Sequence, residues 1–464
     1  MEWDRDITPV AGDEAFFSMP DIDDSDTWTA GILIRDSKKA KETFDALNED
    51  EVTLEEEEYE GVTVYIERSS FGSFGSDVEI PGTAIAFMDE LIVLGSSSDE
   101  AKAVIDVVQG RAESAGENER LKEFRSYQEG DFLVWGYADL ASVWDSLADG
   151  YGDLGSFTDT AGVDPDEVVD GIGGLYDRVG FSVSSMNDGF AFDFIALHAP
   201  DYEPDDSFVP AEAYDPRLAE MLPASTMFYA SVFDVYGQMW EPIKAELGDT
   251  ALADDMTLDD FLEEIESEIG IDIEADFLAL LTGELALAGD LSDFDSDVPD
   301  FEIFMLADVE SGDTAEATLV RLGDYLAGED IILAPRDSGD VTIWELEGER
   351  IAWGVRDDRL IVGYPDDAVE SAIGIDGGSL ADSEDWKRTL ELLPDDTVVV
   401  GYLSLARILE EVQRIDGVAE EFRLPKVAGG LTLADLEPVR SLGFGARDLD
   451  GGTHFRVLIY MNGP

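Results

Sequence analysis

Short hydrophobic runs typical of β-strands are interrupted along the chain by apolar patterns with helical spacing. One β-rich run spans residues 131–138 and is followed by an apolar helical pattern. Another two alternating runs flank Asn187-Asp188-Gly189, which is typical of a tight β-hairpin turn. Hairpin-linked strands interrupted by helices predict an α+β fold with largely antiparallel sheets and packed helices.

The same patterns occur twice in the chain. Residues 131–141 match residues 396–406 without a gap, and residues 180–192 match residues 443–455 in the same way. Self-similarity of this kind indicates a duplicated structural unit. Each copy is predicted to run strand, helix, three strands, helix, and then strand, helix and hairpin.

The duplication suggests a domain organisation. We predict a first repeat unit at 28–200 and a second at 301–464, joined by an acidic, proline-rich linker at 201–222. A strand and helix block at 223–300 precedes the second unit. The N-terminal segment 1–27 is too short to hold a complete counterpart of that block.

The block before the second unit contains a clear helix signal. Thr257 stands in the N-cap position, and Asp260 stands in the position of a capping box. Apolar residues then recur at helical spacing until Gly270, a residue that favours the left-handed conformation at a helix end. The sequence therefore predicts an amphipathic helix between Thr257 and Gly270.

Several of these segments together resemble a known family. The segments are Leu222-Pro223-Ala224-Ser225-Thr226 before a strand, Gly270-Ile271-Asp272 after the helix, Thr282-Gly283-Glu284 before an alternating strand, and residues 377–383 before a helix with a tryptophan. They resemble the prokaryotic family catalogued as domain of unknown function 3352, over about residues 220–420. The resemblance implies no established activity and no catalytic residues. It also implies an extracytoplasmic or cell-surface protein, whereas the start Met1-Glu2-Trp3, which has no leader pattern, favours the cytoplasm as the alternative.

Composition narrows the possible partners. The chain has 108 acidic and 28 basic residues, which gives a net charge of −80. Acids spread along the whole chain indicate a protein of an extreme halophile, and this charge excludes binding of nucleic acid through the phosphate backbone. Hydrophobic residues make up 44% of the chain, which is enough for sizeable cores. No apolar run approaches the ~18 residues of a membrane-spanning helix, so no span is predicted.

Motifs that could carry chemistry are weak. The chain has no cysteine, which excludes disulfides, thiolate metal sites and cysteine nucleophiles. The glycine pattern at 150–155 follows a helical stretch rather than a strand and is interpreted as a loop. The triplet Asp337-Ser338-Gly339 is interpreted as a turn, and the alternating acids at 293–297 lack the glycine and glutamate of a calcium loop. We therefore predict no catalytic, cofactor-binding or metal-binding residues.

One loop is the candidate interaction site. The first unit carries an insertion of small residues at 68–77 that includes Phe71 and Phe74, and the second unit lacks it. Such rings are covered either by the protein's own sheet or by a protein partner or apolar small molecule. The favoured reading is a non-catalytic binding or scaffold protein, not an enzyme. The alternatives are a carrier of an apolar ligand such as a lipid and an enzyme of unknown type.

Overall fold

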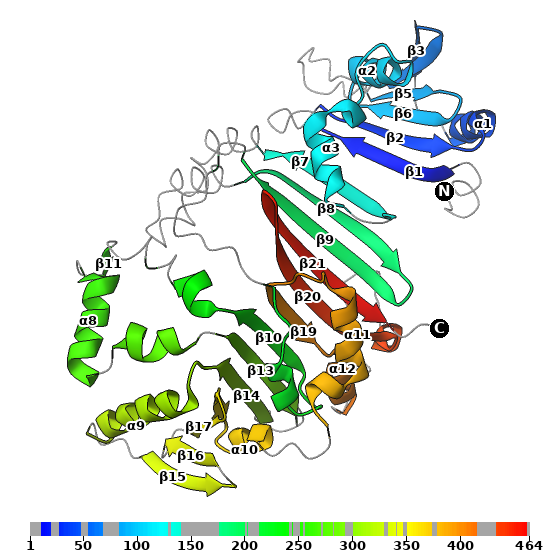
Figure 1. Cartoon of the computed structure of the whole chain (residues 1–464). Helices are drawn as coiled ribbons and strands as arrows, with labels where there is room; N and C mark the ends of the chain where they lie inside the picture. Colours follow the sequence, from blue (N-terminus) through cyan, green and yellow to red (C-terminus); the bar gives the residue numbers. More distant parts are fainter. Residues whose placement is uncertain are drawn as a thin grey trace, which may run out of the picture. The chain divides into compact units, whose positions relative to one another are not determined.

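The computed structural model is an α+β protein with two large antiparallel sheets, which confirms the predicted fold class (Figure 1). It divides into two compact units, residues 1–128 with 139–173 and residues 129–138 with 174–464. The residues that the structure describes are 11–19, 27–47, 54–67, 83–128, 131–140, 176–199, 202, 213–240, 244, 251–253, 256–270, 272–281, 283–292, 300–328, 333–339, 341–346, 350–373, 378–414 and 433–461.

The first unit contains a sheet of six described strands in the order β1-β2-β6-β5-β4-β3. Helices cover both faces: Ala101 and Ile105 of α2 pack with Val93, while Ala40 of α1 packs with Ile34 on the other face. The elements are β1 (Ala11–Ser18), β2 (Thr29–Ile34), α1 (Ser37–Leu47), β3 (Leu54–Tyr59), β4 (Val62–Glu67), β5 (Ala84–Phe87), β6 (Leu91–Gly95), α2 (Ser98–Val108), η2 (Ala115–Glu117) and α3 (Glu119–Ser126).

The second unit contains a sheet of thirteen described strands in the order β15-β16-β17-β18-β14-β13-β10-β19-β20-β21-β9-β8-β7. Its strands are β7 (Val134–Asp139), β8 (Tyr176–Met186), β9 (Gly189–His198), β10 (Phe228–Phe233), β13 (Glu284–Ser292), β14 (Asp300–Asp308), β15 (Leu333–Ser338), β16 (Val341–Leu346), β17 (Ile351–Arg356), β18 (Arg359–Tyr364), β19 (Val399–Leu403), β20 (Val439–Leu449) and β21 (Gly452–Met461).

Helices and short strands complete this unit. They are η4 (Leu218–Met221), η5 (Tyr236–Trp240), β11 (Ala251–Ala253), β12 (Met256–Thr257), α8 (Leu258–Ile269), η6 (Ile273–Phe277), η7 (Leu278–Leu280), α9 (Gly312–Gly328), α10 (Ala368–Ile373), η8 (Leu380–Asp382), α11 (Glu384–Leu392), α12 (Leu405–Arg414) and α14 (Leu433–Leu436). Helix α8 follows its sequence signal: Thr257 and Asp260 form the capping box, and Gly270 ends the helix with φ of 67°.

The strand order of the first sheet recurs at one end of the second. The order β1-β2-β6-β5-β4-β3 corresponds to β13-β14-β18-β17-β16-β15, with α1 and α2 at the places of α9 and α10. Four strands, rather than the expected three, separate the two helices of each copy. Each copy therefore has one strand more than the sequence predicted. The predicted domain boundaries stay predictions.

The hairpins β8–β9 and β20–β21 confirm the predicted pair and join edge to edge through β9 and β21. Phe455 pairs with Phe194, and Val457 pairs with Phe192. In the ungapped sequence match, Phe192 corresponds to Phe455 and Phe194 to Val457. Replacing each residue by its counterpart therefore converts the pair Phe455–Phe194 into the pair Phe192–Val457. The two hairpins therefore meet about a local two-fold axis, which passes through the pair Asp193 and Arg456.

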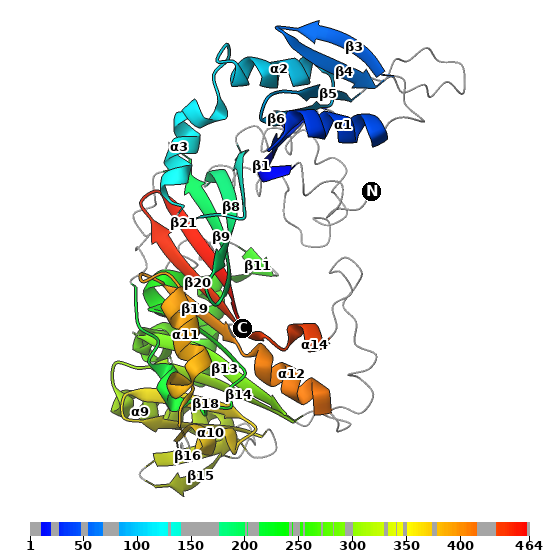
Figure 2. The same ribbon diagram turned by 90° about the vertical axis from the view of Figure 1, so that its right-hand side faces the viewer.

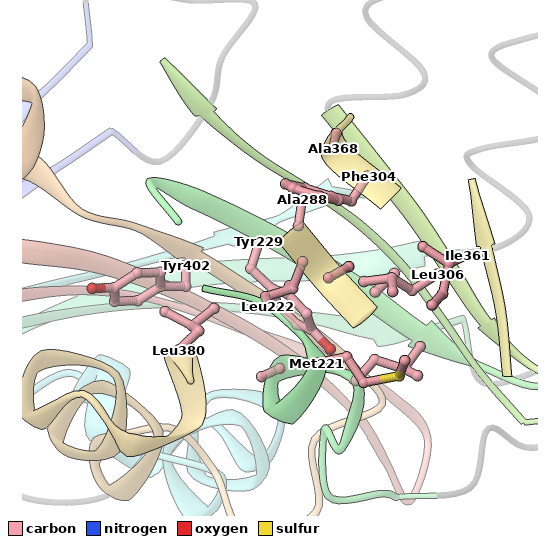
Figure 3. Packing of buried hydrophobic residues seen from close by; sticks show 14 of the residues in the cluster. Met221, Leu222, Tyr229, Ala288, Phe304, Leu306, Ile361, Ala368, Leu380 and Tyr402 are labelled. Carbon is pink, nitrogen blue, oxygen red and sulfur yellow. The ribbon is translucent and has the colours of Figure 1, made fainter. Parts of the chain in front are cut away.

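The largest core of the second unit lies on one face of its sheet, which we call the covered face. The sheet residues on this face include Tyr229, Ala286, Ala288, Phe304, Leu306, Ile361, Tyr402 and Leu458 (Figure 3). Helix α11, beside β20 and β21 (Figure 2), contributes the buried Trp386, whose ring meets Tyr229 and Tyr402 edge-on at centroid distances of 4.9 and 5.3 Å. The elements η4, η8 and α10 complete the cover.

Candidate binding surface

The opposite side of the same strands is partly exposed, although most of its side chains are hydrophobic. At β13 and β14 this side carries a second core with α9, η6 and η7, in which Ala307 is 1% exposed and Leu285 is partly buried. Because side chains alternate between the two faces of a strand, the register of the thirteen-stranded sheet places these residues together. We call this side, from β8 to β14, the open face. Its large hydrophobic residues that are more than a third exposed are Phe181, Phe194, Leu287, Phe301, Ile303 and Phe455.

Aromatic rings dominate the half of the open face formed by the two hairpins. Phe181 pairs with Phe194, and Phe194 pairs with Phe455, so three rings lie in one row across three strands. Phe194 is the most exposed of them, at 48%. Phe444, in the neighbouring row, stacks on Phe455 with ring centroids 6.2 Å apart. The row is therefore continuous from β8 to β21.

The half formed by β13 and β14 is aliphatic and aromatic. Leu287 on β13 is 50% exposed. Ile303 on β14 pairs with Gly289, which also lies on β13. Phe301 stacks on Tyr364 with ring centroids 5.2 Å apart. Between the two halves the side chains are small, with Ala446, Gly401 and Ala230 on three successive strands. In the middle row, Gly401 and Ala230 lie between Phe444 and Leu287, and Cδ1 of Phe444 is 3.6 Å from the Cβ position of Gly401.

Charge is absent from the middle of the open face. The register gives three rows across β8, β9, β21, β20, β19, β10, β13 and β14. The rows are Phe181, Phe194, Phe455, Ala446, Val399, Val232, Leu285 and Ala307; Val183, Phe192, Val457, Phe444, Gly401, Ala230, Leu287 and Met305; and Ser185, Phe190, Ile459, Leu442, Leu403, Phe228, Gly289 and Ile303. Ser185 is the one polar side chain among these residues.

The charged groups nearest to these rows lie at their end. Near the β20–β21 turn, Thr453 and Asp448 pair with each other in the row next to that of Phe455 and Ala446. His198 lies at the end of β9, where its ring meets Tyr202 at a centroid distance of 4.5 Å. Burial lowers the pKa of His198, while the charge of Asp448 acts in the opposite direction. A ligand in the middle of the face would therefore meet hydrocarbon only.

The first unit also exposes a hydrophobic residue, at the position that corresponds to Leu287 of the open face. Ala40 in α1 matches Ala315 in α9, the first helix of the other copy. The same spacing along the sequence aligns Ala30 of β2 with Met305 of β14. Phe17 pairs with Ala30, as Leu287 pairs with Met305. Phe17 is 63% exposed and stacks on Trp28 with ring centroids 6.1 Å apart. Exposed apolar side chains at this position are therefore a property of both copies.

The covered face holds a buried polar cluster at the local two-fold axis. Asp193 Oδ1 accepts hydrogen bonds from His454 Nε2 and Arg456 Nε, each at 2.7 Å. The Nε of Arg447 donates to His454 Nδ1 at 2.9 Å. Burial favours the neutral form of Asp193, but the hydrogen bonds from His454 and Arg456 outweigh burial and hold its pKa below the ordinary value.

This cluster does not form a nucleophilic triad. Ser182 pairs with Asp193 in the sheet and is buried, and its hydroxyl has no hydrogen-bond partner among the described residues. Both nitrogens of His454 are occupied, one by Asp193 and the other by Arg447, so the imidazole cannot accept a proton from Ser182. The cluster is an ion-pair network that joins the two hairpins.

A second buried carboxylate fixes η4 to the sheet. Glu284 is 2% exposed and accepts hydrogen bonds from the hydroxyl of Tyr229 and from the backbone N–H groups of Arg217 (2.6 Å) and Leu218 (2.9 Å). Burial raises the pKa of Glu284 above its ordinary value. These hydrogen bonds give the Glu284 carboxylate a structural role.

The residues singled out in the sequence have different outcomes. Phe71 and Phe74 lie outside the described residues, as do the glycine pattern at 150–155 and the acids at 293–297. The interaction loop stays a prediction. The triplet Asp337-Ser338-Gly339 lies at the end of β15, and Gly339 has φ of 69°, which confirms the turn.

No group of three or more histidine or acidic side chains in the described ranges could hold a metal ion. In the same part of the chain, no helix has the length and apolar composition needed to cross a membrane.

The sequence contains a signal for the open face that we did not recognise. In β9, Phe190, Phe192 and Phe194 alternate with Ala191, Ile195 and Leu197, apart from Asp193, so both faces of the strand are apolar. Such a run is typical of a strand buried on both sides. Here one of the two sides is exposed.

Comparison with known proteins identifies the family. A family model described as "Protein of unknown function (DUF3352)" matches residues 1–443. The chain belongs to this family. No catalytic function is attached to the DUF3352 description. Curated proteins gave no match. A solved structure described as "Structure of crystal form III of TP0453" aligns with 10% identity and a TM-score of 0.25, covering 54% of this chain and 93% of that one.

Proposed function

We propose that this DUF3352 protein is a non-catalytic binding protein, and that the open face is its binding surface. The observation that supports the proposal is the exposed, charge-free set of rows centred on Phe194 and Phe455. In a chain with a net charge of −80, exposed positions are where carboxylates are expected. Large exposed apolar patches in other proteins mark binding sites.

The energetics favour an occupied surface. An apolar patch of roughly 400 Å² contributes about 10 kcal/mol when it is removed from water, before the costs of association are subtracted. High salt strengthens the tendency of apolar surface to leave water. An unoccupied face of this kind would also promote aggregation.

The positions of the titratable groups in the second unit support a non-catalytic function. Asp193, His454 and Glu284 lie on the covered face, and their hydrogen bonds are made within the protein. A general acid or base must reach the substrate. The open face offers no such group in its central rows.

The environment is part of the proposal. The −80 charge supports a protein of an extreme halophile, because a charge of this density is tolerated where salt screens repulsion. Family membership supports a location outside the cytoplasm or at the cell surface. Fractionation of the native cells, followed by immunodetection, tests the location: recovery in the cytosolic fraction alone would contradict it.

Binding at the open face can be tested with the uncharged dye Nile red, which fluoresces in apolar surroundings. The double variant Phe194→Thr with Phe455→Thr removes two rings that face each other on β9 and β21. The control is Val108→Thr, since Val108 is 52% exposed on α2 of the first unit. We expect the double variant to lose most of the dye fluorescence in 2 M KCl and the control to keep it. Equal fluorescence in all three proteins would contradict the proposal.

A further inference from the structure

We propose that the outer edge of β1, which is the edge turned away from β2, binds an uncharged β-strand of another polypeptide by antiparallel pairing. The partner strand resembles β10, which occupies the corresponding edge in the second unit. This interaction site consists of residues other than those of the open face. The inference therefore goes beyond the proposed function and does not depend on it.

The first argument is the strand order of the two copies. β1 corresponds to β13, and matching backbone hydrogen bonds support this alignment. In the first copy Ile34 N–H donates to Glu90 O at 2.8 Å, and in the second Val309 N–H donates to Asp358 O at 2.9 Å. β13 lies between β14 and β10 and pairs with both. β1 pairs with β2 and is the last strand at that end of its sheet among the described residues (Figure 1).

The second argument is the exposure of side chains beside this edge. Ala286 and Ala288 of β13 are 1% and 0% exposed, because they pack in one core with Tyr229 of β10 and with η4. Their counterparts in β1 are Phe16, which is 42% exposed, and Ser18, which is exposed as well. A strand beside β1 would remove part of the Phe16 ring from water, as β10 and η4 do for Ala286.

The third argument is the contrast between the two ends of the six-stranded sheet. At one end β3 carries Glu55–Glu58, and charged side chains on an edge strand oppose pairing with another chain. At the other end Ala15–Ser18 of β1 holds no charge. The register shift between Ala11 and Ala15 confines the regular part of this edge to residues 15–18. The sheet is therefore protected against strand addition at β3 but not at β1.

The backbone groups of the edge select an extended strand as the occupant. Asp234 N–H donates to Gly283 O at 2.9 Å, and alternation along an antiparallel strand then directs the backbone of Leu287 toward β10 as well. Phe17, the counterpart of Leu287, therefore directs its N–H and C=O away from β2. Another strand supplies the donors and acceptors that such groups match. β10 is the pattern for that strand, and it holds no charged residue.

The test uses the full chain in 2 M KCl and a synthetic peptide with the sequence of residues 222–233, which carries a fluorophore and a polyethylene glycol tail. We expect saturable binding, measured by fluorescence anisotropy. The alternation directs Ala230 and Val232 toward β13, and Tyr229 and Ser231 toward β19. N-methylation of the peptide at Ala230 and Val232 should weaken binding by about tenfold or more, because it removes the donors that face β1. N-methylation at Tyr229 and Ser231 should change the affinity by about twofold or less, because those donors face away from β1.

A pair of variants tests the same edge from the side of the chain. Phe17→Pro removes a backbone N–H on the outer edge of β1, and an edge strand tolerates proline there. Phe17→Ala is the control, since it removes the same ring and keeps the N–H. We expect Phe17→Pro to bind the peptide about tenfold more weakly than Phe17→Ala, with equal circular dichroism in 2 M KCl. The N-methylated peptides are measured on the wild type, so the inference stays testable if Phe17→Pro does not fold.

The possible outcomes separate this inference from the proposed function. Absence of peptide binding to the wild type overturns the inference, and so does equal affinity for Phe17→Pro and Phe17→Ala. Loss of affinity on methylation at Tyr229 and Ser231 instead of Ala230 and Val232 overturns the correspondence with β10. A dimer that Phe17→Pro dissociates, detected by light scattering, identifies a second copy as the occupant and overturns the inference. The double variant Phe194→Thr with Phe455→Thr should bind the peptide as tightly as wild type. If it does not, the peptide binds the open face, and the inference fails while the proposed function stands.

Discussion

The two faces of the thirteen-stranded sheet use the same strands and differ in where they place charge. The covered face is buried, yet it holds Asp193, Glu284 and His454. The open face is partly exposed outside the area of β13 and β14 under α9, yet its rows hold no charged side chain. Ordinary partitioning between water and core gives the opposite arrangement. The composition of the open face therefore follows from a requirement other than exposure to water, and ligand binding is the requirement that we propose.

The charges on the covered face have a structural explanation. A buried carboxylate is tolerated when hydrogen bonds replace its water, and Asp193 and Glu284 each accept several. Asp193 also joins the two hairpins through Arg456 and His454. No comparable structural explanation exists for the exposed Phe194 and Leu287. The difference separates residues that hold the sheet together from residues that are available to a ligand.

The largest expected effect concerns the net charge of −80. Lowering KCl from 2 M to 20 mM extends the Debye length from about 2–3 Å to about 20 Å, so charges over much of the molecule repel each other. We expect the chain to unfold, as measured by circular dichroism against salt. A cooperative melt at 20 mM KCl that equals the melt at 2 M would contradict the halophilic part of the account.

The covered face should respond strongly to truncation. Trp386 is 2% exposed, and its ring meets Tyr229 and Tyr402 edge-on. Trp386→Ala should lower the free energy of unfolding by about 3–5 kcal/mol, because it leaves a cavity in the main core. Urea unfolding in 2 M KCl measures this. A loss below about 1 kcal/mol would mean that α11 does not cover the sheet as described.

The buried carboxylates of Glu284 and Asp193 should give opposite pH effects. Burial raises the pKa of Glu284 above its ordinary value of 4.5, so the folded state binds the proton more tightly than the unfolded state does. Its contribution to stability is therefore present at low pH and is lost as the pH rises through the raised pKa. Relative to Glu284→Gln, the wild type should lose stability as the pH rises above 4.5.

Asp193 should behave in the opposite way. Its pKa lies below the ordinary value of 3.8, so its contribution is present above that pH and is lost as the pH falls through the lowered pKa. Relative to Asp193→Asn, the wild type should lose stability on acidification. Urea unfolding between pH 3 and pH 8 measures both differences. If wild type changed stability with pH in the same direction relative to Glu284→Gln and to Asp193→Asn, the surroundings described for one of these carboxylates would be wrong.

The smallest expected effect on stability belongs to the open face. Phe194→Thr with Phe455→Thr should change the free energy of unfolding by about 1 kcal/mol or less, because both rings are already partly in water. The same urea experiment compares this variant with Trp386→Ala. A loss as large as that of Trp386→Ala would show that the two rings belong to a core, and the two faces would no longer differ.

Local features of the fold could be predicted from the sequence, and long-range ones could not. The helix between Thr257 and Gly270 and the hairpin turn at Gly189 have short-range signals, and the structure contains both. The fourth strand between the two helices of each copy was not predicted. The contact between Asp193 and His454 joins residues 261 positions apart, and no local pattern specifies it.

The candidate site was predicted less well than the fold. The sequence analysis selected the loop with Phe71 and Phe74 because flexible residues surround two isolated rings. The rings of the open face are not isolated: Phe190, Phe192 and Phe194 lie in an apolar strand that reads as buried on both sides. The side that water reaches depends on which helices pack onto the sheet. That is a tertiary property, and alternation along one strand does not encode it.

The most direct test of the central claim is photolabelling of the full chain with a long-chain alcohol that carries a diazirine in its hydrocarbon part. After irradiation in 2 M KCl, mass spectrometry of the peptides locates the label. The account predicts label on the open face, within 181–194, 228–232, 285–289, 399–403 and 442–459, and loss of that label in the Phe194→Thr with Phe455→Thr variant. Label spread evenly over the chain, or label in those segments that the double variant retains, would contradict the claim that the open face is the binding surface.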